Sequence, residues 1–199
     1  MNLEIVCTAF ERPTLLMTQL CSLAAQSLQN FKILVFHDGY NAEIENVVSN
    51  FKRIFPLIEV QFRYSALRYN DYGHSLREIA LKESTSKYML LTNDDNYYTP
   101  NFLEELMPAI ESGGFDLSYC NMIHSHKFLN PINPNGYQPL ITGTKLGTID
   151  IGAFIFKTSL GQKVGFVDKS FEADGYFFES LIKIGARAHK VDKYLFVHN

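Results

Sequence analysis

The chain has 199 residues, 18 of them Lys or Arg and 21 Asp or Glu, so its formal net charge is −3. This length is typical of one domain, and a composition of 46% apolar and 20% charged residues excludes disorder throughout the chain. The slightly negative net charge also differs from the excess of Lys and Arg that is typical of proteins that bind the phosphates of nucleic acids.

The first half of the sequence alternates short apolar runs with segments of helical periodicity. This alternation is typical of βα units around a mostly parallel sheet. The predicted strands are Leu3–Cys7, Lys32–Phe36, Ile58–Tyr64 and Lys87–Leu91. The predicted helices between them are 15–24, Ala42–Phe51 and His74–Glu83. Thr99 and Pro100 then suit the N-cap and the first position of a further helix.

The second half is less regular. A strand is predicted at Phe115–Cys120, and residues 121–148 then hold three prolines and little periodicity. A loop of this length inside a compact domain is usually functional. After it we predict the strand Ile149–Phe156, the helix Gly175–Ile184 and the short strand Tyr194–Val197. No linker interrupts the pattern, so residues 1–199 are predicted to form a single α/β domain.

The sequence also indicates a compartment. Its longest apolar runs, such as Ile33–Phe36, are too short to span a membrane, and no secretory signal is recognisable at the N-terminus. Cys7, Cys21 and Cys120 have no metal-ligand spacing and are predicted to be reduced thiols. Together these features predict a cytoplasmic protein with no membrane span and no nucleic-acid partner.

Several polar residues directly follow predicted strands, where open α/β sheets bind their ligands. They are Thr8, Asp38, Asp94, Asp95 and His198. Each has an ordinary alternative explanation. Asp38-Gly39 is a common turn signal, and adjacent carboxylates such as Asp94 and Asp95 often cap a helix. The convergence of all these residues at one edge of a sheet is the stronger indication of a site.

The acidic turn at Asp94 and Asp95 suits a hard cation, because Mg²⁺ and Mn²⁺ are held by one or two carboxylates together with substrate phosphates. Arg77 lies on the preceding predicted helix and would add a fixed positive charge for phosphates. The alternative for Arg77 is a surface position, paired with Glu78 or Glu83.

Together these motifs resemble the GT-A-fold glycosyltransferases, specifically family 2 of the nucleotide-diphospho-sugar transferase superfamily. The residues Thr8-Ala9-Phe10-Glu11-Arg12-Pro13 resemble the opening turn of that family, and Asp38-Gly39 resembles its nucleotide contact. The segment 93–96, Asn-Asp-Asp-Asn, is similar to the Asp-x-Asp metal motif, and Arg77 lies 17 residues before Asp94. Residues 164–166 and 172–174 resemble the segments near the catalytic base, and His198 falls where many members place a metal-binding His.

The resemblance implies a GT-A fold with a Rossmann-like central sheet, and an inverting transfer of sugar from a nucleoside-diphosphate donor to a saccharide or other hydroxyl acceptor. It implies Asp174 as general base with Glu172 in reserve, and Asp95 and His198 as ligands of Mn²⁺ or Mg²⁺. The long loop at about 121–148, with His124 and His126 at its start, would shape the acceptor side. The implied donor-binding residues are Thr8, Ala9, Glu11, Arg12, Asp38, Arg77, Asn93 and Asp94.

Two departures from the family pattern bear on function. Asn93 replaces the first Asp of Asp-x-Asp, and an amide is a weaker metal ligand than a carboxylate. The acids Glu172 and Asp174 are separated by Ala173, and Asp174 on its own also suits a helix cap. The alternative function is therefore a degenerate GT-A domain that binds nucleotide or glycan without turnover.

Two other α/β classes are excluded by the turn after the first strand. A nucleotidyltransferase would carry a Gly-rich basic loop there, and a dinucleotide-dependent oxidoreductase would carry G-x-G-x-x-G. The segment Thr8–Pro13 contains no glycine.

Overall fold

The computed structural model describes residues 2–125 and 136–199. The strands in this part of the chain are β1 (Leu3–Ala9), β2 (Phe31–His37), β3 (Glu59–Tyr64), β4 (Tyr88–Asn93), β5 (Tyr97–Tyr98), β6 (Leu117–His124), β7 (Gln138–Leu140), β8 (Phe154–Lys157) and β9 (Ala188–His198). The α-helices are α1 (Pro13–Ala24), α2 (Ala42–Ile54), α3 (His74–Glu83), α4 (Phe102–Glu111), α5 (Thr158–Val164) and α6 (Ala173–Lys183), and a short 3₁₀ helix covers Ile151–Ala153.

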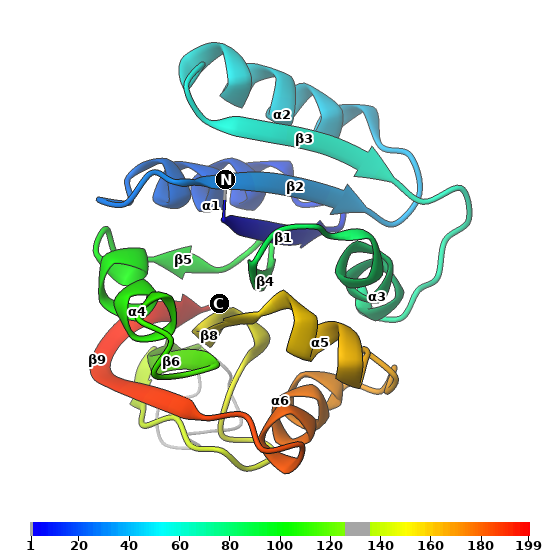
Figure 1. Ribbon diagram of the computed structural model, residues 1–199. Coiled ribbons are helices and arrows are strands. Elements are labelled where there is room, and N and C mark those ends of the chain that lie inside the picture. The colour runs from blue at the N-terminus through cyan, green and yellow to red at the C-terminus, as the bar shows by residue number, and fades with distance from the viewer. Residues whose placement is uncertain (1, 126–135) are drawn as a thin grey trace.

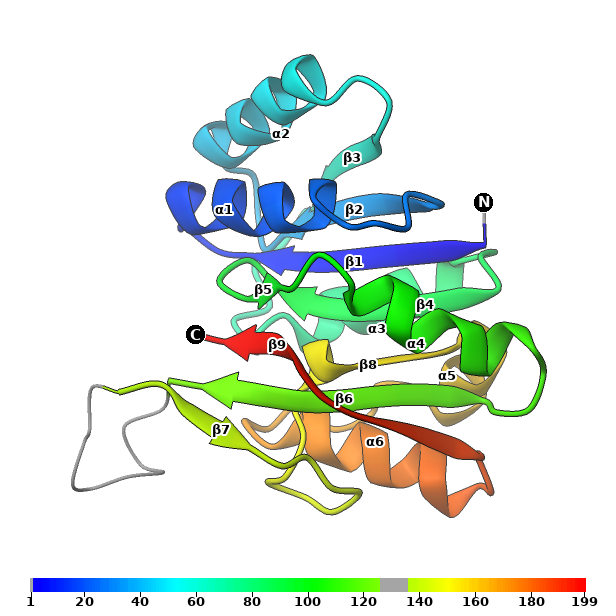
Figure 2. The same cartoon turned by 90° about the vertical axis from the view of Figure 1, so that its left-hand side faces the viewer.

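These strands form a mixed sheet in the order β3-β2-β1-β4-β8-β6-β9-β5, with β7 paired to β6 (Figure 1). The first four strands in this order are parallel, whereas β8 is antiparallel to both of its neighbours. β1, β4, β6 and β9 all point toward the same edge of the sheet, where the C-terminus also lies (Figure 2). The α/β prediction with a Rossmann-like sheet is confirmed, and this common edge is where the polar strand ends gather.

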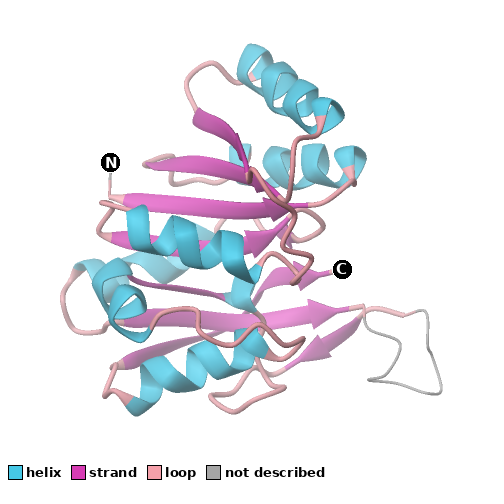
Figure 3. Ribbon diagram, turned by 90° about the vertical axis from the view of Figure 1, so that its right-hand side faces the viewer, coloured by secondary structure: helices cyan, strands magenta, loops and turns pink. Residues whose placement is uncertain are grey.

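Helices cover both faces of the sheet. α1, α2 and α4 lie on one face, and α3, α5 and α6 lie on the other (Figures 2 and 3). Pro13 begins α1, where its missing N–H costs no helical hydrogen bond. The side chain of Asn41 caps α2 by accepting from the backbone N–H groups of Glu43 and Ile44. β1 is buried along its whole length because helices cover both of its faces.

The helices α4 and α6 begin at other residues than predicted. The helix expected at Thr99-Pro100 begins at Phe102, because the Thr99 N–H donates to Leu195 O (3.0 Å) and so continues the pairing of β5 with β9. The last helix begins at Ala173 rather than Gly175, with Glu172 at its N-cap position. Asp174 therefore lies inside the first turn of α6 and is not its cap.

The region from 121 onward also differs from the prediction. β6 continues to His124 and β7 forms at Gln138–Leu140, so residues 121–148 are only partly loop, and the predicted site at His126 lies outside the described residues. The strand expected at Ile149–Phe156 begins at Phe154, because the Asp150 side chain accepts from Gly152 N (2.8 Å) and turns the chain into a 3₁₀ helix. β9 is longer than predicted because its irregular pairing with β6 interrupts the apolar alternation.

Two further observations concern the described residues. None of the helices there is long and apolar enough to cross a membrane. Cys7, Cys21 and Cys120 are free thiols, of which Cys21 is exposed and the other two are buried.

Candidate active site

Two adjoining cavities lie at the edge of the sheet where β1, β4 and β9 end. The larger has a volume of about 680 Å³ and the smaller about 330 Å³, and both are lined by Asn93 and His198. The larger cavity brings together eight of the predicted site residues: Thr8, Ala9, Glu11, Arg12, Asp38, Asn93, Asp95 and His198. The smaller cavity is lined by the predicted residues Arg77, Glu172 and Asp174.

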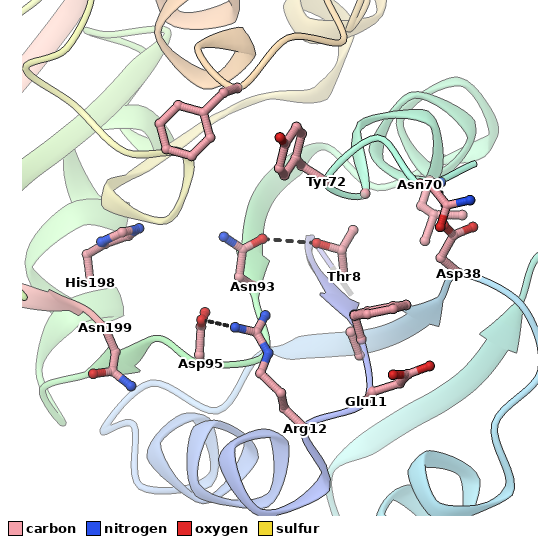
Figure 4. Close-up of a pocket in the computed structure, with 15 residues that line it drawn as sticks. Thr8, Glu11, Arg12, Asp38, Asn70, Tyr72, Asn93, Asp95, His198 and Asn199 are labelled. Carbon is pink, nitrogen blue, oxygen red and sulfur yellow. Dashed lines mark hydrogen bonds and ion pairs between the residues drawn. The ribbon is translucent and has the colours of Figure 1, made fainter. Parts of the chain in front are cut away.

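Parallel pairing of β1 with β4 sets Thr8 opposite Asn93 at the floor of the larger cavity. The Thr8 hydroxyl donates to Asn93 Oδ1 (3.1 Å), as Figure 4 shows. The Arg77 Nη2 group also donates to Asn93 Oδ1, and it donates to the Thr8 hydroxyl at 3.2 Å. The amide oxygen at position 93 is thus engaged by two donors.

Arg77 is 1% exposed, so the surface position considered for it is wrong. Glu78 pairs instead with Lys82 and Lys169. The Arg77 Nη1 group donates to Tyr72 O (3.2 Å) and to His74 Nδ1 (2.6 Å). A buried guanidinium needs several acceptors to offset its lost hydration, and α3 places this one between the two cavities.

The acidic turn after β4 is bound by Arg12. The Arg12 Nη2 group donates to Asp94 and its Nη1 group donates to Asp95. Asp94 is fully buried and also accepts from Phe10 N (2.8 Å). Burial raises the pKa of Asp94 to about 6, although the Arg12 charge and the Phe10 N–H oppose the shift. Asp95 instead faces the larger cavity, beside Arg12 (Figure 4).

Asp38 follows β2 and shapes the rim of the larger cavity. Its buried carboxylate accepts from the backbone N–H groups of Tyr69 (2.9 Å) and Asn70 (2.8 Å) and from the Ser65 hydroxyl (3.1 Å). These bonds fix the backbone of the segment that leads into α3.

The two predicted candidates for general base differ in environment. Glu172 is exposed at the rim of the smaller cavity. Asp174 is 20% exposed, and its Oδ1 atom has no hydrogen-bond donor among the described residues. That oxygen lies 3.7 Å from Arg77 Nη1 and 3.9 Å from His74 Nδ1. This oxygen is therefore buried beside a positive charge, while the side chain as a whole lines the smaller cavity.

Burial raises the pKa of Asp174 to about 6, and it does so against the opposing Arg77 charge. Burial and the neighbouring Arg77 charge lower the pKa of His74 to about 4, so its imidazole is neutral near pH 7. The neutral ring accepts the Arg77 hydrogen bond at Nδ1. Near neutral pH the carboxylate of Asp174 is ionised, as proton abstraction requires.

Asp150 and His198 form an ion pair, with His198 Nε2 3.1 Å from Asp150 Oδ2. Burial opposes the charge of His198, but Asp150 holds its pKa above the ordinary value for histidine. Burial likewise opposes the charge of Asp150, and the charge and hydrogen bond of His198 hold the Asp150 pKa below its ordinary value. The His198 ring also stacks on His124, with centroids 4.4 Å apart.

The described residues provide oxygen and nitrogen donors for a divalent cation, but not a protein-made cage. No group of three or more His, Cys, Asp or Glu side chains within residues 2–125 and 136–199 is arranged to hold a metal ion. Asp95 and His198 do both line the larger cavity. Mg²⁺ usually keeps several waters and takes its remaining ligands from one or two carboxylates and substrate phosphates. Asp95 fits a cation that arrives with a diphosphate, and His198 would join it as a neutral imidazole, without the proton that Asp150 stabilises.

The sequence left some functional neighbours unassigned. His74 was predicted only as the start of a helix, yet it is 2% exposed and contacts Arg77. Tyr72 lines both cavities. Neither residue belongs to a recognisable motif. The one sequence feature that could have indicated them is their position next to Arg77: Tyr72 lies just before α3, and His74 is the first residue of that helix.

Comparison with protein families places most of the chain in one of them. The model described as "Glycosyl transferase family 2" matches residues 4–172. This segment includes the ends of β1 and β4 and stops just before Asp174, so Asp174 and His198, the last residue of β9, lie beyond the matched residues.

Two curated relatives carry related descriptions. An uncharacterized glycosyltransferase, YwdF, of Bacillus subtilis (strain 168) is 27% identical over 115 residues, which are 58% of this chain and 40% of that protein. An uncharacterized glycosyltransferase of Rickettsia bellii (strain RML369-C) is 21% identical over an alignment of 162 residues, which covers 74% of this chain and 23% of that protein. The chain thus spans well under half the length of either relative.

Solved structures share the fold. S. aureus TarS 1-349 in complex with UDP-GlcNAc has a TM-score of 0.77 at 16% identity, covering 99% of this chain and 58% of that one. The mannosyltransferase PcManGT from Pyrobaculum calidifontis, in complex with GDP-Man and Mn²⁺, has a TM-score of 0.76 at 13% identity, covering 99% and 56%. The expected GT-A fold is therefore confirmed.

Proposed function

Because this chain belongs to glycosyl transferase family 2, we propose that it transfers a sugar from a nucleoside-diphosphate donor to a hydroxyl acceptor. The observation that carries the proposal is the carboxylate of Asp174, which lines the smaller cavity directly beside the larger one at the ends of β1 and β4. A carboxylate that lines one cavity, next to a second polar cavity for the other substrate, is what a displacement between two substrates requires.

The larger cavity is proposed as the donor site. Its volume of about 680 Å³ lies in the range of small-molecule sites. Arg12, whose side chain is 42% exposed, supplies a cation at the rim for the diphosphate. The donors GDP-Man and UDP-GlcNAc in proteins of the same fold support a nucleotide sugar as the ligand class.

Asp174 is proposed as the general base of an inverting displacement, with Glu172 in reserve. The acceptor hydroxyl passes its proton to Asp174 while its oxygen bonds to the anomeric carbon. The bond from that carbon to the diphosphate oxygen breaks, and its electron pair leaves with the nucleoside diphosphate. Arg77, 3.7 Å from Asp174, favours the ionised carboxylate before the transfer.

A divalent cation, Mn²⁺ or Mg²⁺, bound together with the diphosphate would supply neutralisation of the charge on the leaving group. Asp95 and His198 are the residues proposed to hold it. Asn93 is not proposed as a ligand, because its amide oxygen accepts from Thr8 and Arg77.

The second candidate is a nucleotide- or glycan-binding domain without turnover. The observation in its favour is that Arg12 already bridges Asp94 and Asp95, so the acidic turn has a cation of its own. Such a domain would bind nucleotide with no requirement for metal and would transfer nothing.

A thermal-shift panel of UDP, GDP, dTDP and CDP, each with and without Mn²⁺, tests the donor site. A nucleotide at about 100 times its dissociation constant stabilises the fold by roughly 2.7 kcal/mol, which raises Tm by about 5–11 °C for a chain of this size. We expect one nucleotide to give this shift, with a larger shift when Mn²⁺ is present. No shift with any nucleotide would overturn the donor site.

The panel also separates the two candidates when it is combined with a transfer assay. A nucleotide-induced thermal shift that is the same with and without Mn²⁺, together with no release of nucleoside diphosphate from the sugar donor, supports the binding domain without turnover. A metal-dependent shift with product formation supports the transferase.

A further inference from the structure

Two aromatic side chains are exposed to solvent at the border of the two cavities. Tyr72 and Phe171 are 67% and 69% exposed, and both line the larger and the smaller cavity. Their rings meet edge to face, with centroids 5.8 Å apart and an interplanar angle of 77°. Figure 4 shows Tyr72 across the larger cavity from Asp95 and Arg12. Large exposed apolar rings inside a polar site indicate a ligand surface.

The backbone at Tyr72 is held in a conformation that the residue itself disfavours. Its φ is +59°, in the left-handed region, where the Cβ atom of a side-chain-bearing residue crowds the backbone. The surroundings impose this conformation: Asp38 accepts from Asn70 N, Arg77 donates to Tyr72 O, and Gly73 packs against Thr8. An exposed Tyr gains little burial in return, so its presence there is not explained by folding.

Phe171 is fixed to the same part of the molecule. The Lys169 ammonium donates to Phe166 O (2.6 Å), to His74 O (3.3 Å) and to Glu78 (2.6 Å). Phe166 is buried and stacks on His74, with centroids 5.2 Å apart. The segment that carries Phe171 is therefore tied to the start of α3, and the spacing of the two exposed rings is set by the fold.

The neighbours of this pair define what it would contact. Asp174, Glu172 and Asp150 line the smaller cavity beside it and present hydrogen-bond acceptors. A sugar ring has an apolar face of C–H groups and an equatorial rim of hydroxyls, so it matches an aromatic face next to carboxylates. A linear polyol or an amino-acid hydroxyl has no such face.

We propose that Tyr72 and Phe171 form an acceptor platform, on which a saccharide ring stacks so that one hydroxyl reaches Asp174. This inference rests on the proposed transferase function and narrows its acceptor to a saccharide. The platform would bind the acceptor through its ring face, while the donor occupies the larger cavity.

The absence of tryptophan from the sequence makes a direct test possible. Phe171→Trp places a single indole on the platform, and its emission is followed while monosaccharides and disaccharides are titrated in the presence of nucleotide. We expect a saturable change with at least one saccharide. When Tyr72→Ala is combined with Phe171→Trp, the apparent affinity for the saccharide should fall about three- to tenfold, which corresponds to the loss of one aromatic contact.

A matched control exists elsewhere on the surface. Tyr40 and Tyr64 are 59% and 50% exposed and meet edge to face at 5.1 Å, but neither lines the cavities. Tyr40→Trp should give no saturable change with the same sugars. The proposal is overturned by an equal response in this control, by an equal response of Phe171→Trp to sorbitol, ribitol or glycerol, or by no response to any saccharide.

Failure of the platform and failure of the transferase function give different results. The nucleotide thermal shift is measured on the same Phe171→Trp protein. A nucleotide shift without a saccharide response overturns the platform alone, whereas a saccharide response without any nucleotide shift overturns the transferase function.

Discussion

The Nη1 atom of Arg77 lies 3.7 Å from the Oδ1 atom of Asp174, and the Nη2 atom of the same guanidinium donates to Asn93. One buried cation therefore contacts the floor of the larger cavity and the proposed base in the smaller cavity. The two cavities are linked electrostatically through a side chain that solvent does not reach.

Replacement of Asp174 by Asn should abolish transfer while leaving nucleotide binding intact. A general base contributes about 10²–10⁴-fold to a rate, and Asn keeps the shape of the side chain without its basicity. Product release is measured with the donor found in the nucleotide panel, and the nucleotide thermal shift serves as the folding control.

Glu172→Gln is the matched variant, since Glu172 lines the same cavity. It should keep transfer within about tenfold of the unmodified protein, an estimate for an exposed group that is not the base. Full activity in Asp174→Asn together with loss in Glu172→Gln would move the base to Glu172.

The pH dependence of transfer should report the ionisation of Asp174. Its pKa is raised to about 6 by burial, and a base acts in its deprotonated form. The value of kcat/KM is therefore expected to rise about tenfold per pH unit below pH 6 and to level off above about pH 7. A flat profile between pH 5 and 8 would contradict Asp174 as the base.

Arg77→Met should destabilise the fold strongly. The change removes the Arg77 donor from His74 Nδ1 and Tyr72 O, and one of the two donors from Asn93 Oδ1. Removal of one member of a buried charged network costs about 3–5 kcal/mol, measurable as a lower free energy of unfolding in urea.

The control for this change is Arg63→Met. Arg63 pairs with Glu83 on the surface, and both side chains are well exposed. Exposed pairs contribute at most about 1 kcal/mol. Equal losses in the two variants would show that the Arg77 contacts contribute no more than a surface pair.

Gly73→Ala should destabilise the segment that carries Tyr72. Gly73 has a φ of +82°, and an added Cβ would lie 2.9 Å from Thr8 Cβ. Backbone strain costs roughly 1–2 kcal/mol, and the steric overlap adds about 1–3 kcal/mol. Thermal unfolding measures the sum, and the nucleotide shift should fall because Thr8 lines the larger cavity.

Gly113→Ala separates the two contributions. Gly113 has a similar φ of +79°, but an added Cβ meets nothing within 4 Å. It should show only the backbone cost and an unchanged nucleotide shift. If Gly113→Ala lost as much thermal stability as Gly73→Ala, the overlap with Thr8 would contribute nothing measurable.

The sequence by itself determined which segments form the parallel half of the sheet and which polar residues end its strands. Buried parallel strands are apolar on both faces, so 3–7, 32–36 and 87–91 are recognisable from composition alone. Thr8, Asp38 and Asp95 follow those runs, and the common direction of parallel strands brings them to one cavity.

The tertiary structure decided what each of these side chains contacts. Arg12 binds carboxylates that are 82 and 83 residues away, and Arg77 binds a hydroxyl that is 69 residues away. The burial of Arg77, the engaged amide of Asn93 and the burial of the Asp174 Oδ1 atom all follow from such long-range packing. Local periodicity records only neighbours along the chain, whereas burial and hydrogen-bond partners depend on segments that meet after folding.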